Sequence, residues 1–287
     1  MTHPKWKAIP AAAALLALAF TSPPSVAAQL TPETARAFEQ YISAKEARSS
    51  LDLVANKNFL FIDALPQAQK DQAYAKLRHG QILAQRYDEC GSPRCASISG
   101  GLIHDWIGIV FVPGISIPQA LATLQDYDHD ADYYRSEVVK SKLLAQSGAD
   151  FHIYLRLKEV QVITVVLDTE YDIRYARVDG DHASARSYSV RVQEVAHPGA
   201  TNERDEPIGN DHGFLWRLDS YWRFYRADGG VYIQCDAVSL TRDVPVGLGW
   251  LTSSFVEKIP AASLRSTLAE TRAALFGKST FLKENSP

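Results

Sequence analysis

Residues 214–240, FLWRLDSYWRFYRADGGVYIQCDAVSL, contain the clearest fold signal in the sequence. Two runs rich in aromatic and β-branched residues, 214–225 and 231–240, lie on either side of Asp-Gly-Gly at 228–230. Such runs are typical of strands, and a Gly-containing pair between them is typical of a tight β-hairpin. We therefore expect two antiparallel strands joined by a short turn.

Five further runs of this kind precede the hairpin. The first of them ends at Pro113 and Gly114, which are typical of strand ends, and turn residues such as Gly148 separate the others. The runs cover residues 100–113, 138–146, 151–160, 162–178 and 184–195. Because consecutive strands joined by short turns pair antiparallel, the pattern predicts one seven-stranded antiparallel sheet.

Helices are expected before the strands. Thr31 followed by Pro32 is typical of a helix start, and a second helix is expected from Pro66 to Gly80. Two short helices bury too little surface to be stable alone. We therefore interpret residues 29–95 as an N-terminal helical extension packed on the main domain.

Two more helices are expected within the main domain. Ser116 is a suitable N-cap for a short helix with Pro118 in its first turn. A long C-terminal helix is expected over residues 246–276, because Leu264 and Leu268 belong to one apolar stripe there.

This order of strands and helices resembles the START and Bet v1-like helix-grip (SRPBCC) superfamily, which includes polyketide cyclase-like and lipid-transfer proteins. The resemblance covers about residues 100–276 and rests mainly on the order of the elements. Its most distinctive stretches are GLIHDW at 101–106, Trp216 and Trp222 around Tyr221, and RDVP at 242–245 with GLGW at 247–250. It implies an α+β helix-grip fold, in which a curved seven-stranded antiparallel sheet wraps around the C-terminal helix. The expected domain spans 96–278, and 279–287 form a flexible tail.

The resemblance also implies a cavity between the sheet and the last helix that holds an apolar ligand. Alternation along each strand decides which side chains face this cavity. The expected ligand contacts are Trp106, Tyr188, Trp216, Leu218, Ser220, Trp222, Phe224, Ile233, Ala237, Leu264 and Leu268. In the alternative interpretation these side chains fill a solid core, and a pocket of about 300 Å³ or more distinguishes the two.

His104 and Asp105 are the candidates for acid–base catalysis, because a titratable group facing a dry cavity can acquire a useful pKa. Adjacent strand residues point to opposite faces of a sheet. Only one of the two can therefore face the cavity, and we do not expect them to act together there.

Five acidic residues follow the spacing of a calcium-binding loop: Asp126, Asp128, Asp130, Asp132 and Glu137. Ala131 occupies the position where that loop requires glycine, and the aromatic Tyr133 follows shortly after. We prefer a solvated acidic turn, with calcium binding as a weak alternative, and expect no metal site.

Motifs for common catalytic classes are absent from the sequence. It contains no G-x-S-x-G, G-x-G-x-x-G, P-loop or H-E-x-x-H motif, so no cofactor is expected and non-enzymatic binding is favoured. The formal charge is only -3, without a basic block, so a nucleic-acid partner has no electrostatic support. Mean hydropathy is -0.17, which is typical of an ordinary globular protein.

The first residues have the layout of an export signal. Lys5 and Lys7 precede an apolar run over 8–20, and small residues around Ala28 suit a cleavage site there. The run is shorter than the roughly 20 residues that a membrane span needs. We expect residues 1–28 to be removed, and the mature protein, without a transmembrane span, to reside in a bacterial periplasm or be secreted.

The cysteines agree with an oxidising compartment. Cys90 and Cys95 flank a Gly-Ser-Pro turn, a spacing that favours a disulfide between them. Cys235 lies in the hairpin and is interpreted as a small buried residue.

The sequence thus predicts an exported protein that binds a hydrophobic or amphipathic small molecule, a lipid or a ring compound. One alternative is an enzyme of cyclase, dehydratase or hydrolase type that uses the same cavity. A second is a non-catalytic interaction module with a filled core.

Overall fold

The computed structural model describes residues 28–55, 58–87, 97–160, 164–243 and 259–284. The expected signal segment before residue 28 and the pair Cys90 and Cys95 lie outside these residues. Their cleavage and their disulfide therefore stay predictions.

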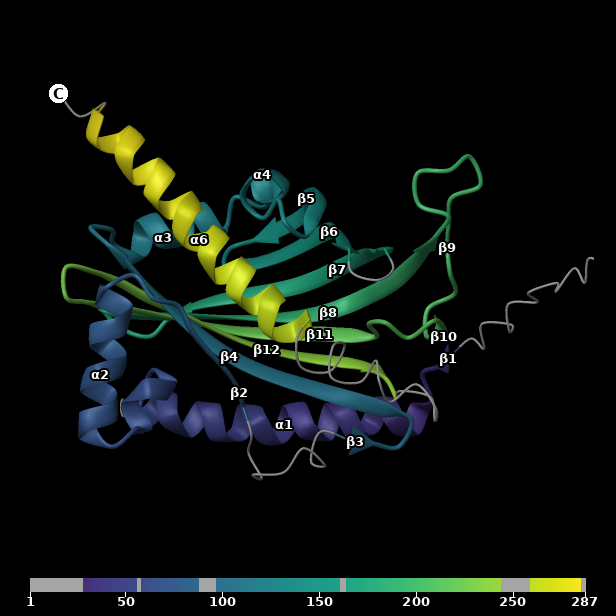
Figure 1. Ribbon diagram of the computed structural model, residues 1–287, viewed down its shortest axis with the longest axis horizontal. Helices are drawn as coiled ribbons and strands as arrows, with labels where there is room; N and C mark the ends of the chain where they lie inside the picture. Colours follow the sequence, from purple (N-terminus) through teal and green to yellow (C-terminus); the bar gives the residue numbers. More distant parts are fainter. Residues whose placement is uncertain (1–27, 56–57, 88–96, 161–163, 244–258, 285–287) are drawn as a thin grey trace, which may run out of the picture.

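One large, curved antiparallel sheet forms the body of the protein (Figure 1). All seven predicted strands are present, so the α+β helix-grip fold is confirmed. Their bounds are β4 Gly101–Pro113, β5 Val138–Ser147, β6 Asp150–Val160, β7 Thr164–Arg177, β8 His182–Ala196, β11 Arg217–Ala227 and β12 Gly230–Arg242.

The sheet is larger than predicted, because short strands extend it. The strand β2 (Leu83–Arg86) pairs with β4 at one edge, which gives the order β2-β4-β12-β11-β8-β7-β6-β5. This strand lies within the expected N-terminal helical extension, residues 29–95, where no strand was predicted. Two-residue strands β3 (Ser97–Ile98) and β9 (Arg204–Asp205) add to β4 and β8, and β1 (Ala28–Gln29) pairs with β10 (Asn210–Asp211) separately.

The hairpin that decides the fold has a two-residue loop. Ala227 pairs with Gly230, and both Asp228 and Gly229 have positive φ angles, 51° and 72°. This is the backbone that a tight hairpin of right-handed twist requires. Gly230 is needed for space, since a Cβ atom there would lie 2.3 Å from the carbonyl oxygen of Val112 on β4.

Three helices begin close to the predicted residues. The C-terminal helix is described only from Ile259, and it continues to Glu284, so the prediction of a flexible tail from residue 279 was wrong. Ser116 accepts a hydrogen bond from the Gln119 backbone, and the Gln119 side chain bonds back, which completes a capping box. The elements are α1 (Pro32–Ala55), the 3₁₀ helix η1 (Phe61–Ala64), α2 (Gln67–Arg78), α3 (Ile117–Leu124), the 3₁₀ helix η3 (Tyr127–His129), α4 (Asp130–Tyr133) and α6 (Ile259–Glu284). None of the helices within the described ranges is long and apolar enough to cross a membrane.

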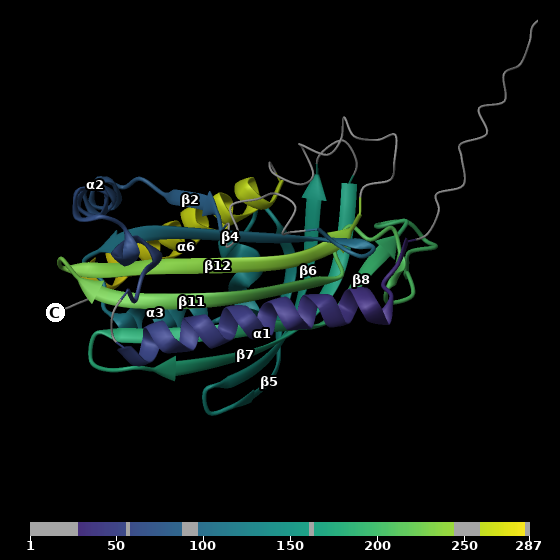
Figure 2. The same cartoon turned by 90° about the horizontal axis from the view of Figure 1, so that it is seen from below.

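Helices cover both faces of the sheet. Figures 1 and 2 show α6 across one face and α1 along the opposite face. The apolar side of α1, with Phe38 and Ile42, packs against Ile103 of β4 and Leu240 of β12. We call the sheet face under α6 the inner face and the face under α1 the outer face.

The inner helix approaches the sheet most closely at Gly108 of β4. A Cβ atom there would lie 2.7 Å from Cδ1 of Leu268 and 3.1 Å from Cδ2 of Leu264. The missing side chain therefore lets α6 rest on β4 at this point.

Candidate functional site

A cavity of about 690 Å³ lies between the inner face of the sheet and α6. Its walls come from β4, β12, β11, β7 and β6, from the segment around α4, and from the first part of α6. This volume is well above the ~300 Å³ of a small-molecule pocket. The interpretation of a solidly filled core is wrong for this part of the molecule.

The cavity runs along the strands. Cys235 and Thr241 of β12 both line it, and six residues of strand correspond to roughly 20 Å. Leu124 of α3 and Asp130 of α4 lie toward one end, which we call the α4 end. Leu102, which pairs with Thr241, and Arg242, which pairs with Gly101, lie toward the other end.

Seven of the eleven predicted ligand contacts line the cavity: Trp106, Leu218, Ser220, Trp222, Phe224, Ala237 and Leu264. They come from β4, β11, β12 and α6, as the alternation of side chains predicted. Neighbouring positions on three strands meet at its floor, where Ala237 pairs with Trp106 on one side and with Ser220 on the other. The small side chains of Ala237 and Ser220 leave this floor open.

Two predicted contacts lie on the outer side instead. Trp216 precedes the first residue of β11, and its indole Nε1 donates to Oδ1 of Asp211 at 3.0 Å, among residues that pack against α1. Tyr188 donates its hydroxyl hydrogen to Glu46 of α1. The shared face predicted for Trp216 and Trp222 was wrong, because the regular alternation of the strand begins only after Trp216.

Ile233 and Leu268 are fully buried in the core cluster of the inner face and are not part of the cavity wall. Leu268 lies against β4 at Gly108, where the helix rests on the sheet. Both residues pack in the same core cluster as Leu264, which lines the cavity.

Sequence reasoning missed the wall formed by β6, β7 and the segment around α4. Its aromatic members are Tyr127, Tyr134, Tyr171 and Tyr175. The signal was present, because residues 165, 167, 171, 173 and 175 alternate as apolar or aromatic side chains along β7.

The tyrosine hydroxyls of this wall stay neutral at physiological pH. Burial raises the pKa of Tyr171 to about 12, and it also raises the pKa values of Tyr127, Tyr134 and Tyr175. The Tyr171 hydroxyl is buried and has no hydrogen-bond partner within the described part of the chain. The wall therefore combines apolar rings with uncharged polar atoms.

The two catalytic candidates lie on opposite faces of β4, as alternation predicted. His104 faces the cavity, is 4% exposed, and its Nε2 lies 2.9 Å from Oγ1 of Thr241. Asp105 faces outward and does not line the cavity. His104 is thus the one of this pair that a bound ligand can contact.

Asp105 belongs to a buried ion cluster under α1. Lys45 Nζ lies 2.8 Å from Oδ2 of Asp105 and 2.9 Å from Oδ1 of Asp236, and Tyr41 donates a hydrogen bond to Asp105. Burial and the Asp236 carboxylate raise the pKa of Asp105, although Lys45 opposes the shift. One lysine for two carboxylates fits a structural role in holding α1 on the sheet.

The five acids of the calcium-like spacing do not converge on one point. Asp126 accepts hydrogen bonds from His129 and Tyr133, and Asp128 accepts one from the backbone of Leu143. Asp132 is exposed. Asp130 and Glu137 line the cavity. Over the described ranges, no group of three or more acidic, histidine or cysteine side chains is placed to hold a metal ion.

Cys235 lies in the cavity wall as a free, buried thiol. Burial raises its pKa well above the usual value, so it is an un-ionised small residue there.

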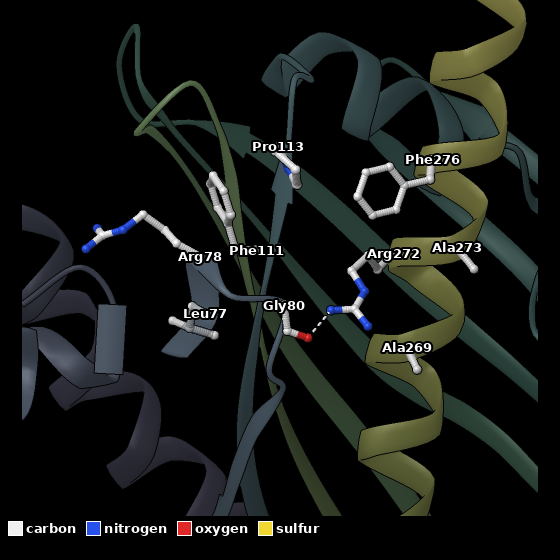
Figure 3. Close-up of a pocket in the computed structure, with 9 residues that line it drawn as sticks. All are labelled: Leu77, Arg78, Gly80, Phe111, Pro113, Ala269, Arg272, Ala273 and Phe276. Carbon is white, nitrogen blue, oxygen red and sulfur yellow. Dashed lines mark hydrogen bonds between the residues drawn. The ribbon is translucent and has the colours of Figure 1, made fainter. Parts of the chain in front are cut away.

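A second, smaller hollow of about 460 Å³ lies between α2, β4 and α6 (Figure 3). Phe111 and the partly exposed Phe276 form its apolar sides, and Arg272 crosses it to donate a hydrogen bond to the carbonyl oxygen of Gly80. This hollow lies outside the sheet–helix cavity and contains none of the predicted contacts.

No protein-family model matches the sequence, and no curated protein has a significant match to it. Similar solved structures include a STAR-related lipid transfer protein fragment from Xanthomonas axonopodis, which is 18% identical with a TM-score of 0.48 over 68% of this chain and 93% of that chain. Human STARD10 is 11% identical, with a TM-score of 0.42 over 77% and 84%. The Zhui aromatase/cyclase from Streptomyces sp. R1128 is 13% identical, with a TM-score of 0.40 over 62% and 94%. All three similarities lie below 25% identity and concern the fold alone.

Proposed function

We propose that this protein binds a hydrophobic or amphipathic small molecule in the cavity between the inner face and α6. The observation that carries the proposal is the cavity of about 690 Å³ itself, since folded proteins seldom leave so large an apolar space unfilled. Each buried methylene contributes about 0.8 kcal/mol of favourable binding free energy. A twelve-carbon chain therefore gains roughly 10 kcal/mol before the entropic cost of immobilising it is subtracted.

The cavity lining is mainly apolar, and its polar side chains are spread along its length. The Trp106 indole N–H has no hydrogen-bond partner within the described ranges, whereas Trp222 donates to Oγ of Ser220 at 3.1 Å. His104 and Thr241 lie beyond Trp106 on the way to the end opposite α4. A mainly apolar guest with one or two polar groups fits this lining.

The neutral fluorescent probe N-phenyl-1-naphthylamine tests the proposal. It should bind saturably with increased emission, and it should quench the tryptophan emission, because Trp106 and Trp222 both line the cavity. Native mass spectrometry of gently purified protein should also reveal a retained lipid-like molecule. Absence of saturable binding by folded protein would overturn the proposed function.

We also propose that the chain is exported, with residues 1–28 as its signal. The charged start, the apolar run and the small residues at Ala28 support this proposal. N-terminal sequencing of the protein from the exported fraction should begin at Gln29. Recovery of the protein only inside the cell with residues 1–28 still attached would contradict it.

A further inference from the structure

The α4 end of the cavity contains an acid without a partner. Asp130, the first residue of α4, is 5% exposed and lines the cavity. Its carboxyl group has no hydrogen bond or ion pair with any residue that the structure describes. Buried polar groups without a partner are uncommon in folded proteins, because each costs free energy.

The hydroxyl groups around Asp130 are engaged elsewhere. The Tyr127 and Tyr175 hydroxyls lie 2.7 Å apart, and Tyr175 also donates to the carbonyl oxygen of Leu124. The Tyr134 hydroxyl lies 3.1 Å from Oγ1 of Thr271. These three tyrosines lie near enough to Asp130 for its charge to contribute to their raised pKa values, while their hydroxyl groups bond to other oxygens.

The charges near this end are negative. Asp126 lies close enough that its carboxylate, together with burial, raises the pKa of Asp130 well above its usual value. The basic residues of the lining are farther along the strands: Arg242 pairs opposite Gly101 at the start of β4, and Lys158 lies opposite Val166 near the start of β7. Within the described residues, no cation neutralises Asp130.

We propose that Asp130 is the recognition residue for a protonated amine at the end of an otherwise apolar ligand. The inference rests on the proposed function and names the chemical class of the guest. An ammonium group at this position would donate hydrogen bonds to the carboxylate and lie among tyrosine rings, whose faces attract cations. The ligand's charge would also remove the cost of ionising Asp130, since an opposite charge favours the carboxylate form.

Three probes of equal chain length separate this recognition from simple apolar binding: dodecylamine, dodecanol and dodecanoate. Each is titrated at pH 7 against protein that carries N-phenyl-1-naphthylamine. We expect dodecylamine to displace the probe at least about tenfold more tightly than dodecanol, and dodecanoate to bind most weakly. A hydrogen bond to a charged group contributes about 1.5–3 kcal/mol, so Asp130→Asn should weaken dodecylamine about tenfold to a hundredfold and leave dodecanol within about threefold.

Two variants accompany Asp130→Asn. Asp132→Asn removes the same charge from an exposed position of the same helix and should change no affinity. Asp130→Glu keeps the carboxylate and should retain the preference for dodecylamine. This variant shows whether a weaker affinity in Asp130→Asn comes from the lost charge or from a folding defect.

The outcomes separate the two proposals. If none of the three probes binds to folded protein, the proposed function is overturned together with this inference. If dodecanol binds as tightly as dodecylamine, or if Asp130→Asn preserves the preference for dodecylamine, the amine recognition is overturned while the proposed function stands.

Discussion

Replacement of Lys45 by methionine is expected to lower the free energy of unfolding by about 3–5 kcal/mol, because it leaves the buried Asp105 carboxylate and the largely buried Asp236 carboxylate without a cation. Lys45 is 5% exposed and lies between Asp105 and Asp236, with its ammonium group 4.2 Å from the centre of the Tyr87 ring. Methionine has a similar length and fills the same space, so the loss of stability measures the effect of removing the positive charge.

The loss should depend on pH. Burial and the Asp236 carboxylate already raise the pKa of Asp105 in the folded protein, and removal of Lys45 raises it further. A group with a raised folded pKa favours the folded state at low pH, and this advantage disappears as the pH rises through that pKa. The difference between the variant and the parent should therefore be smaller at pH 5 than at pH 8.

Urea denaturation at both pH values measures this prediction. Lys142→Met on β5 is the matched control, because Lys142 is exposed. The buried ion cluster would lose its assigned role if the two variants lost equal stability, or if the loss for Lys45→Met grew on acidification.

Ala237→Trp is expected to weaken binding of N-phenyl-1-naphthylamine by about a hundredfold. Ala237 lies between Trp106 and Ser220 on the cavity floor, so an indole there occupies the middle of the space that the guest needs. Loss of burial equivalent to about four methylenes corresponds to roughly 3 kcal/mol, or about two orders of magnitude in affinity. The cavity provides room for the ring, so thermal unfolding should change little.

The exposed Ala122 on α3 provides the control, since Ala122→Trp adds the same ring away from the cavity. Fluorescence titration of both variants measures the effect. Unchanged affinity in folded Ala237→Trp would place the probe elsewhere, for example in the hollow beside Phe276 (Figure 3).

The hairpin side chains that face the cavity could be predicted, because successive side chains of a strand point to opposite faces of the sheet. Leu218, Ser220, Trp222 and Phe224 line the cavity together, as period-two alternation requires. Trp216 departs from the pattern because it lies one residue before β11, and its indole bonds to Asp211. Strand ends are where such alternation stops being informative.

Long-range partners were not predictable in the same way. Lys45 is 60 residues from Asp105 and nothing in their local sequence links them, yet they form a buried pair. Asp130 was counted among five acids of a possible calcium loop, but only the packing of α4 beside α6 and β5 places it in the cavity. The spacing of acidic residues in the sequence does not indicate which side of a short helix is buried.

The sheet, its antiparallel pairing, the hairpin turn and the short helix after Ser116 could all be predicted from local sequence patterns. These features depend on neighbouring residues, through side-chain alternation, turn chemistry and capping. The open space under α6, the position of Asp130 in it without a partner, and the ion pairs of Lys45 with two distant acids became visible only in the folded chain. Those features depend on which distant segments approach each other, and on how much volume their side chains leave unfilled.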